Sequence, residues 1–174
     1  MLQNKPAVIR NGVKIILLNK DHELLLMCTD DSNIQSNTGS YNGIFWQMIG
    51  GKIENGETII EAAYRELYEE TGLTQQEVNL ENRACWYGEF DLFMYGVLTR
   101  IKQSFLVAKT RKIDVSLANL TDEEKLVVKR VKWFTLTDIT NCNEIIYPAV
   151  LKDYLPDVIN GLRTDKPIIL DLAK

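Results

Sequence analysis

Three glutamates on one face of a predicted helix are the residues whose types and spacing point most directly to chemistry. The helix is expected over Thr58–Thr71, and at about 100° per residue Glu66, Glu69 and Glu70 fall within one arc of roughly 100°. Like charges three and four residues apart cost a helix roughly 0.2–0.5 kcal/mol per pair. A divalent cation would offset this repulsion, and clustered carboxylates are hard oxygen ligands suited to Mg²⁺ or Mn²⁺. From the helix alone, a solvated acidic face is an equal alternative.

A glycine-rich turn that leads into this helix favours the metal site over the acidic face. Gly50, Gly51 and Gly56 bracket the turn, and glycine allows both a positive φ and a close backbone approach to a ligand. Amides and carbonyls of such a loop can face a phosphate and a metal ion respectively. Together with the glutamates, the turn outlines a site where a metal ion neutralises a diphosphate and activates a water.

The segment Gly51–Leu73 resembles the Nudix box at every defined position. It reads Gly, five residues, Glu57, seven residues, Arg65-Glu66-Leu67, one residue, Glu69-Glu70, one residue, Gly72-Leu73. Fixed residues at about 7% usage each make the probability of a chance match on the order of 10⁻⁷. Weaker resemblance extends over most of the chain. One departure is Ile49, where many family members have proline, and it puts the rigidity of the loop in doubt.

The resemblance implies a fold, a reaction and a cofactor. Nudix enzymes hydrolyse a diphosphate linked to another group, commonly a nucleoside diphosphate derivative, and they need Mg²⁺ or Mn²⁺. We therefore predict an α+β fold, an α/β/α sandwich in which a mixed β-sheet is flanked by helices. The expected partner is a small nucleotide-derived diphosphate, and a homodimer is also compatible with the family.

The resemblance also implies roles for individual residues. The expected metal ligands are oxygen donors of the box and its loop: Gly50, Glu66, Glu69 and Glu70. The residues themselves give candidate substrate contacts in or beside the glycine loop: Trp46, Gly50, Gly51 and Lys52. The alternative for Trp46 is packing in the core, and the alternative for Lys52 is a solvated side chain. Arg65 is expected to hold the glutamates in register, and Glu57 to fix the junction between loop and helix through Arg65.

The residue that accepts a proton from the attacking water is left open by the sequence. It is either a glutamate of the box or a glutamate from a later loop, for which Glu123 and Glu124 are the candidates. The alternative for both is that they form the acidic first turn of a surface helix, where carboxylates are favoured by the helix dipole.

Composition and charge exclude several other classes of protein. The chain has 174 residues and a net charge of −4, which argues against general nucleic-acid binding. Its cysteines, Cys28, Cys85 and Cys142, have spacings that fit neither a disulfide framework nor a zinc site, so free thiols in a reducing compartment are expected. The apolar runs are too short to span a bilayer, and we expect a cytoplasmic protein without a membrane segment.

Two further functions are compatible with a Nudix-like chain. The first is a non-catalytic nucleotide-sensing module, although such modules often lose box glutamates and this chain keeps them all. The second is isomerisation of a prenyl diphosphate, which normally uses a cysteine. No cysteine here has a context that fits that chemistry, and the lone His22 lies in a predicted turn.

The remaining elements are expected to surround the box-like segment within one domain, residues 1–174. The sequence predicts a hairpin of Val13–Leu18 and Glu23–Cys28, and a surface loop over Asp30–Gly43. Further predicted strands are Arg83–Phe90, Ile101–Lys109 and Val127–Thr135. A terminal helix is expected over Tyr147–Asn160, with Pro156 inside it.

Overall fold

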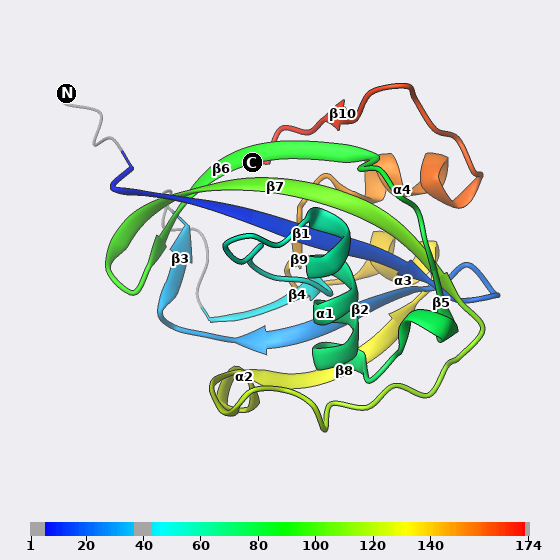
Figure 1. Ribbon diagram of the computed structural model, residues 1–174, viewed down its shortest axis with the longest axis horizontal. Helices are drawn as coiled ribbons and strands as arrows, with labels where there is room; N and C mark the ends of the chain where they lie inside the picture. The colour runs from blue at the N-terminus through cyan, green and yellow to red at the C-terminus, as the bar shows by residue number, and fades with distance from the viewer. Residues whose placement is uncertain (1–5, 37–42, 173–174) are drawn as a thin grey trace.

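A curled β-sheet forms the centre of the fold (Figure 1). The computed structural model describes residues 6–36 and 43–172. In chain order the elements are β1 (Val8–Leu18), β2 (Leu24–Asp30), β3 (Ile34–Ser36), β4 (Ile44–Met48), α1 (Ile59–Thr71), the 3-10 helix η1 (Gln75–Glu77), β5 (Val78–Leu80), β6 (Trp86–Met94), β7 (Val97–Thr110), α2 (Asp122–Val127), β8 (Val128–Phe134), α3 (Leu136–Asn141), β9 (Ile146–Tyr147), α4 (Leu151–Ile159) and β10 (Ile168–Ile169).

The sheet is mixed, and it opens in the middle. Its main path runs β10-β6-β7-β1-β2-β4-β9, with β3, β5 and β8 pairing to β6, β7 and β2. Strands β1 and β7 are parallel over the whole of β1, whereas β6 and β7 form an antiparallel hairpin. Strands β1 and β2 pair at one position only, Leu18 with Leu24, so the two strands diverge beyond their turn.

The segment that follows β4 runs along β1 where the sheet opens. The Ile15 amide donates to the Ile49 carbonyl at 2.8 Å, and the Val13 amide donates to the Gly51 carbonyl at 2.9 Å. The Ile53 amide returns a hydrogen bond of 3.0 Å to Asn11. Backbone groups that β2 does not satisfy are therefore paired with the glycine loop, which holds that loop beside β1.

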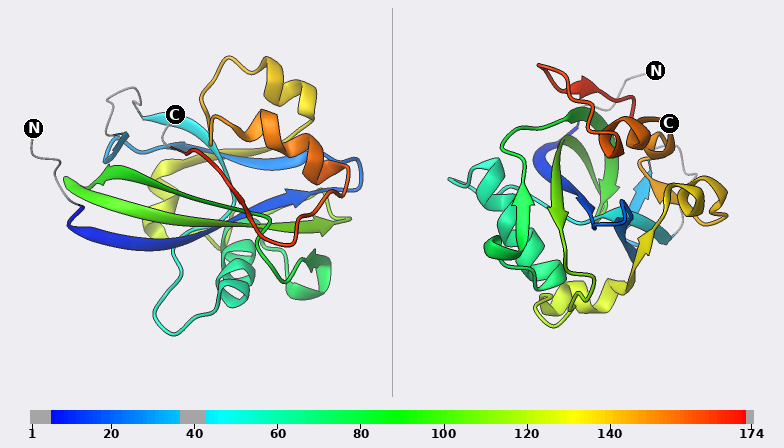
Figure 2. Two further views of the ribbon diagram at one scale, coloured as in Figure 1. Left: turned by 90° about the horizontal axis from the view of Figure 1, so that it is seen from above. Right: turned by 90° about the vertical axis from the view of Figure 1, so that its right-hand side faces the viewer.

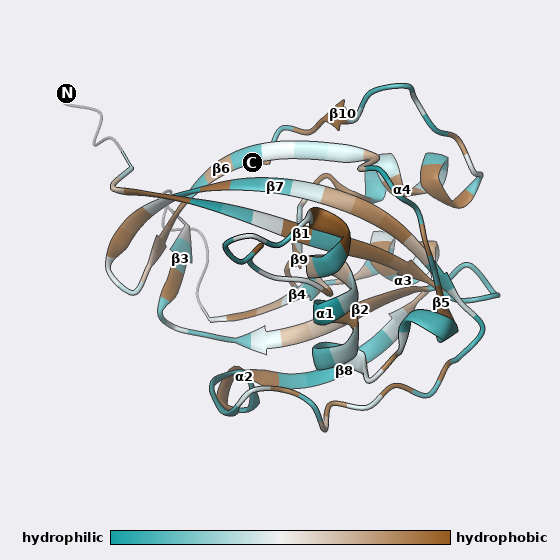
Figure 3. Ribbon diagram, in the orientation of Figure 1, coloured by the Kyte–Doolittle hydropathy of each residue, from teal (hydrophilic) through white to brown (hydrophobic). Residues whose placement is uncertain are grey.

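Two hydrophobic cores lie on opposite faces of the sheet. Helix α1 covers one face through Ala62, Ala63 and Leu67, which pack on the odd-numbered side chains of β1. Helices α3 and α4 cover the other face, where Trp46, Trp86 and Phe105 are buried. Figure 2 shows these helices on either side of the sheet, and Figure 3 shows the hydrophobic stretches of β1, β2 and β7 between them. The predicted α+β architecture, a mixed sheet flanked by helices, is confirmed.

Helix α1 has the predicted signals at both ends. The Thr58 hydroxyl accepts from the Glu61 amide while the Glu61 carboxylate accepts from the Thr58 amide, so the capping box is present. Gly72 ends the helix at φ 72°, and its amide donates to the Tyr68 carbonyl. The hairpin of β1 and β2 is also as predicted, with His22 in its turn at φ 62°.

Other elements differ from the prediction. The terminal helix begins at Leu151 rather than Tyr147, because Ile146–Tyr147 pairs with β4 as strand β9; Pro156 is accommodated inside α4. The predicted loop over Asp30–Gly43 contains strand β3, which pairs with β6, and its residues 37–42 lie outside the described residues.

Two predictions about the whole chain can be compared with this fold. All three cysteines are free thiols, as expected. None of the helices in the described part of the chain combines the length and apolar character needed to span a lipid bilayer.

Candidate active site

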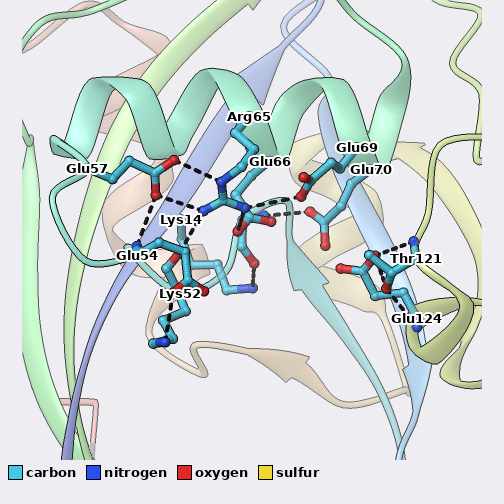
Figure 4. Close-up of polar contacts among 11 residues, drawn as sticks. Lys14, Lys52, Glu54, Glu57, Arg65, Glu66, Glu69, Glu70, Thr121 and Glu124 are labelled. Carbon is cyan, nitrogen blue, oxygen red and sulfur yellow. Dashed lines mark hydrogen bonds and ion pairs between the residues drawn. The ribbon is translucent and has the colours of Figure 1, made fainter.

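Helix α1 presents its glutamates to the glycine loop in two different environments. Glu66 and Glu70 lie one turn apart and border the apolar side of the helix, so they are 5% and 4% exposed. Glu69 lies farther out, with 30% of its side chain exposed. Figure 4 shows all three carboxylates on the lower side of the helix. Two buried carboxylates at adjacent turns require a compensating positive charge.

Arg65 ties the loop to the glutamates. Its Nε and Nη2 donate to the two carboxylate oxygens of Glu57 at 2.8 and 2.9 Å. Its Nη1 donates to Glu66 at 2.7 Å and to Glu69 at 3.1 Å, and Nη2 also reaches the Lys52 carbonyl at 2.8 Å. The hydrogen bonds that Arg65 donates to Glu57 lower the pKa of Glu57 and raise the pKa of the guanidinium. The predicted pairs of Arg65 with Glu57 and Glu69 are therefore present.

The double glycine lies between β1 and helix α1, and neither position has room for a side chain. Gly50 has φ +126°, and a β-carbon there would lie 2.2 Å from the Val13 carbonyl oxygen. A β-carbon on Gly51 would lie 2.6 Å from Oε1 of Glu66. The Gly50 amide donates to Oε2 of Glu70 at 2.7 Å. The absence of side chains thus lets the loop backbone and the carboxylates share one small volume.

Lys14, which the sequence analysis did not single out, reaches the other side of the same loop. Its ammonium donates to the Gly50 carbonyl at 2.6 Å, to the Gln47 side-chain oxygen at 2.8 Å and to the Met48 carbonyl at 3.1 Å. The only signal in the sequence is a lysine inside the predicted strand Val13–Leu18, whose other residues are apolar. Burial lowers the pKa of Lys14, and the nearby charges of Glu70 and Glu66 oppose that change.

Burial is also the main electrostatic influence on the two inner carboxylates. It raises the pKa of Glu66, against the opposing effect of Arg65. It raises the pKa of Glu70 to about 8, and the charge of Glu66 adds to that rise while Lys14 opposes it. A buried carboxylate whose ionised form is disfavoured is one that a bound cation would stabilise.

Glu124 reaches this cluster from the segment between β7 and β8. That segment docks on the C-terminal end of α1, where the Ser116 amide donates to the Thr71 carbonyl at 2.9 Å and the Asn119 side chain to the Tyr68 carbonyl at 3.1 Å. Glu124 closes the capping box of α2, and both capping contacts, from the Thr121 amide and hydroxyl, go to Oε2 at 2.8 Å. Docking on α1 therefore fixes where this capped carboxylate lies.

Carboxylates of Glu66, Glu70 and Glu124 form one group whose ligand atoms lie within 4.8 Å of one another. Hard oxygen donors at this spacing, two of them buried, fit a divalent cation such as Mg²⁺ or Mn²⁺. Glu69, which was also predicted to bind metal, is not part of this group and pairs with Arg65. Glu123 is exposed and lies outside the group as well.

The predicted substrate contacts are distributed unevenly around the cluster. Gly50 and Gly51 line it, whereas the Lys52 side chain is exposed and pairs with Glu54 at 2.9 Å. Trp46 lies apart from the site in the core between the sheet and α3–α4: it is 1% exposed, and its indole N–H donates to Glu144 at 2.9 Å. Its burial favours a packing role over contact with a ligand.

Arg10 is a basic residue of β1 that faces the acidic cluster. Its Nη1 donates to the Met94 sulfur at 3.9 Å, and sulfur is a weak acceptor. Burial lowers the pKa of the guanidinium, while the charges of Glu66 and Glu54 act in the opposite direction. Arg10 therefore brings a positive charge close to the glutamates, and it forms no ion pair with a carboxylate of the described residues.

Comparison with known proteins identifies the family of this arrangement. A family model described as the NUDIX domain matches residues 8–155. The chain belongs to the Nudix family. The match includes the glycine loop, α1 and Glu124, so every group of the candidate site lies within the Nudix domain.

Relatives and solved structures agree with this assignment. An RNA pyrophosphohydrolase of Pelagibacter ubique is 41% identical over 70 residues, which is 40% of this chain and 39% of that protein. Another, from Actinobacillus pleuropneumoniae, is 30% identical over 66% of this chain and 61% of its own length. This chain thus spans only part of either relative's length.

The fold is shared with solved Nudix structures. A MutT protein from Methanosarcina mazei has a TM-score of 0.62 at 21% identity, covering 91% of this chain and 96% of that one. A NUDIX hydrolase from Nitrosomonas europaea has a TM-score of 0.63 at 19% identity, with 91% and 92% covered. At these identities the likeness establishes the fold alone.

Proposed function

We propose that this Nudix protein is a pyrophosphohydrolase that uses Mg²⁺ or Mn²⁺ to cleave a diphosphate linkage in a nucleotide derivative. The observation that carries the proposal is the group formed by Glu66, Glu70 and Glu124, in which two carboxylates are buried beside a glycine loop. The names of the two relatives, RNA pyrophosphohydrolase, support the same reaction class.

The proposed roles of the glutamates and of Arg65 follow from their contacts. Glu66 and Glu70 hold the cation with the Glu124 carboxylate beside it, and a bound cation would neutralise diphosphate oxygens and lower the pKa of an attacking water. Arg65 orients Glu66 and keeps Glu69 beside it as a further ligand, and Glu57 holds Arg65 in place. Catalysis of this kind depends on positioning and charge more than on covalent chemistry.

Glu124 is the proposed acceptor of the water's proton. It is less buried than Glu66 and Glu70, and within the described part of the chain its carboxylate forms no ion pair. Its capping contacts both go to Oε2, so they hold the side chain without engaging Oε1. A positioned carboxylate at the open side of the cluster suits a general base.

Arg10 and the loop glycines are the proposed substrate contacts. The guanidinium of Arg10 suits the outer phosphate of the substrate, because Arg is a strong hydrogen-bond donor to phosphate oxygens. Gly51 permits close approach of the diphosphate to the backbone, and the exposed ammonium of Lys52 lies at the edge of the loop. Aromatic recognition by Trp46 forms no part of the proposal, since that side chain is buried.

The test is product formation from a substrate panel with Mg²⁺ and with Mn²⁺, with products identified by mass. The panel includes nucleoside triphosphates, nucleotide sugars, dinucleoside polyphosphates, ADP-ribose and RNA with a terminal triphosphate. Glu70→Gln should keep the fold and lose most of the rate, whereas Glu123→Gln should match the wild type. Full activity of Glu70→Gln would remove the metal-site assignment.

The alternative function, a nucleotide-sensing module without catalysis, predicts a different outcome from the same panel. Saturable binding of a nucleotide with no product, in the presence of either metal, would favour the sensor. The retention of Glu66, Glu69 and Glu70 together with the Glu124 carboxylate favours the enzyme, because ligand binding alone does not require this set.

A further inference from the structure

Lys14 is the one cation among the described residues that donates a hydrogen bond to the Gly50 carbonyl of the glycine loop. Its strand neighbours Val13 and Ile15 are fully buried apolar residues that face α1, while the Lys14 side chain lies where the sheet opens between β1 and β4. A lysine in such a place loses hydration and side-chain entropy, so its ammonium must be stabilised by specific partners.

Three oxygen atoms provide that stabilisation. The Gly50 carbonyl lies 2.6 Å from the ammonium, the Gln47 side-chain oxygen 2.8 Å and the Met48 carbonyl 3.1 Å. Gln47 is itself held, since its amide nitrogen donates to the Thr29 hydroxyl at 3.0 Å. All three donor hydrogens of the ammonium are thus matched by neutral oxygens that come from one short segment of chain.

Gly50 joins this cation directly to the carboxylate cluster. Its carbonyl accepts from Lys14 at 2.6 Å, and its amide donates to Glu70 at 2.7 Å. The ammonium of Lys14 therefore occupies the Gly50 carbonyl oxygen, which the resemblance to the Nudix box implied as a metal ligand. Hard oxygen donors of this kind bind either an ammonium through hydrogen bonds or a divalent cation by coordination.

We propose that the ammonium of Lys14 stands in place of one divalent cation, so that the site binds one metal ion fewer than its oxygen ligands could hold. The inference rests on the metal site of the proposed function and adds to it the role of a positioning residue. Lys14 supplies a fixed positive charge beside Glu70 and holds the loop that has Ile49 in place of proline.

The experiment counts Mn²⁺ ions bound per chain, by equilibrium dialysis and by the loss of the free Mn²⁺ resonance signal, with no substrate present. Lys14→Met keeps the length of the side chain and removes its charge. We expect Lys14→Met to bind one Mn²⁺ more than the wild type. The matched control Lys52→Met removes an exposed ammonium of the same loop that contacts Glu54 rather than Gly50, and it should leave the number unchanged.

A second variant keeps the test decisive if Lys14→Met does not fold. Lys14→Ala leaves space for a small amine, so propylammonium should displace one Mn²⁺ from it, whereas propanol should not and the wild type should not respond. Equal, non-zero numbers of ions in the wild type and in the folded Lys14 variants would overturn this inference alone. Absence of Mn²⁺ binding in the wild type and in every variant would instead contradict the proposed function.

Discussion

Gly51 and Glu66 are so close that a β-carbon on Gly51 would lie 2.6 Å from the Glu66 carboxylate oxygen Oε1 and 3.0 Å from its carboxyl carbon. That oxygen also accepts a hydrogen bond of 2.7 Å from Arg65, so the carboxylate cannot move aside without breaking it. The glycine is therefore part of what positions the Glu66 ligand, in addition to allowing the turn.

The first prediction is that Gly51→Ala weakens metal binding. The added methyl group displaces the Glu66 carboxylate, and misplacing a ligand through its surroundings typically costs about 10–100-fold in metal affinity. Calorimetric titration with Mn²⁺ measures the change. Gly56→Ala is the control, because a β-carbon there meets nothing within 4 Å, although its φ of +85° imposes backbone strain. Equal Mn²⁺ affinity in the wild type and Gly51→Ala would contradict the prediction.

The second prediction concerns the pair of Glu57 and Arg65. Glu57→Gln removes the carboxylate that holds two guanidinium nitrogens, so Arg65 positions Glu66 and Glu69 less firmly. We expect kcat to fall about tenfold with little change in KM, as for the loss of a group that orients a ligand. Steady-state kinetics at saturating Mg²⁺ measure both. Glu54→Gln, whose side chain pairs with exposed Lys52, is the control.

The third prediction separates two effects of Thr121: capping of helix α2 and positioning of the Glu124 carboxylate at the cluster. Thr121→Val removes the hydroxyl that donates to Glu124 and should cost about 1 kcal/mol of stability as well as activity. Thr135→Val removes the equivalent hydroxyl from the capping box of α3, where the partner is Asp138. Both variants should lose similar stability in thermal unfolding, and only Thr121→Val should lose rate. A parallel loss of rate in both would show that capping alone matters.

The fourth prediction tests Arg10 as a phosphate contact. Arg10→Gln removes a positive charge that interacts with Glu66 and Glu54 but is in no ion pair among the described residues, so the affinity for the metal ion should stay the same or rise. Loss of a charged hydrogen bond to substrate should raise KM about ten- to a hundredfold. Kinetics on the best substrate of the panel, with Mn²⁺ titrations in parallel, measure both. An unchanged KM would mean that Arg10 does not contact the substrate.

The local part of the site could be predicted from the sequence because its contacts are short-range. Arg65 and Glu69 are four residues apart on one helix, and Glu57 and Arg65 are eight residues apart across the loop–helix junction. The capping box of Thr58 with Glu61 and the role of Gly72 follow from spacing in the same way. These relationships need only the geometry of one helix and its entry turn.

Lys14 and Glu124 could not be assigned in this way, because tertiary structure brings them to the site. Lys14 meets Gly50 from 36 positions away, and it does so because β1 diverges from β2 and leaves room for the loop. Glu124 depends on the docking of Asn119 on Tyr68, a contact across 51 positions. The same reasoning applies to Trp46, a candidate substrate contact with core packing as its alternative, because only the tertiary structure shows that α3 and α4 cover it.

The last prediction concerns the pH dependence of stability through Glu81 and Arg163, which join the segment before β6 to the segment after α4. Arg163 donates to both carboxylate oxygens of Glu81, at 2.8 and 2.7 Å, and these bonds lower the pKa of Glu81 from its ordinary 4.5. Since the folded pKa is the lower one, the stabilisation is present above about pH 4.5 and is lost as the pH falls through the folded value.

Glu81→Gln should therefore lower the free energy of unfolding by about 1 kcal/mol at pH 7, and the difference from the wild type should shrink in acid. Urea unfolding at pH 7 and at pH 3 measures it, with Glu89→Gln as the control because Glu89 lies 3.9 Å from Lys102 on the surface. A difference between Glu81→Gln and the wild type that does not change with pH would mean that packing of the side chain, rather than its charge, stabilises this junction.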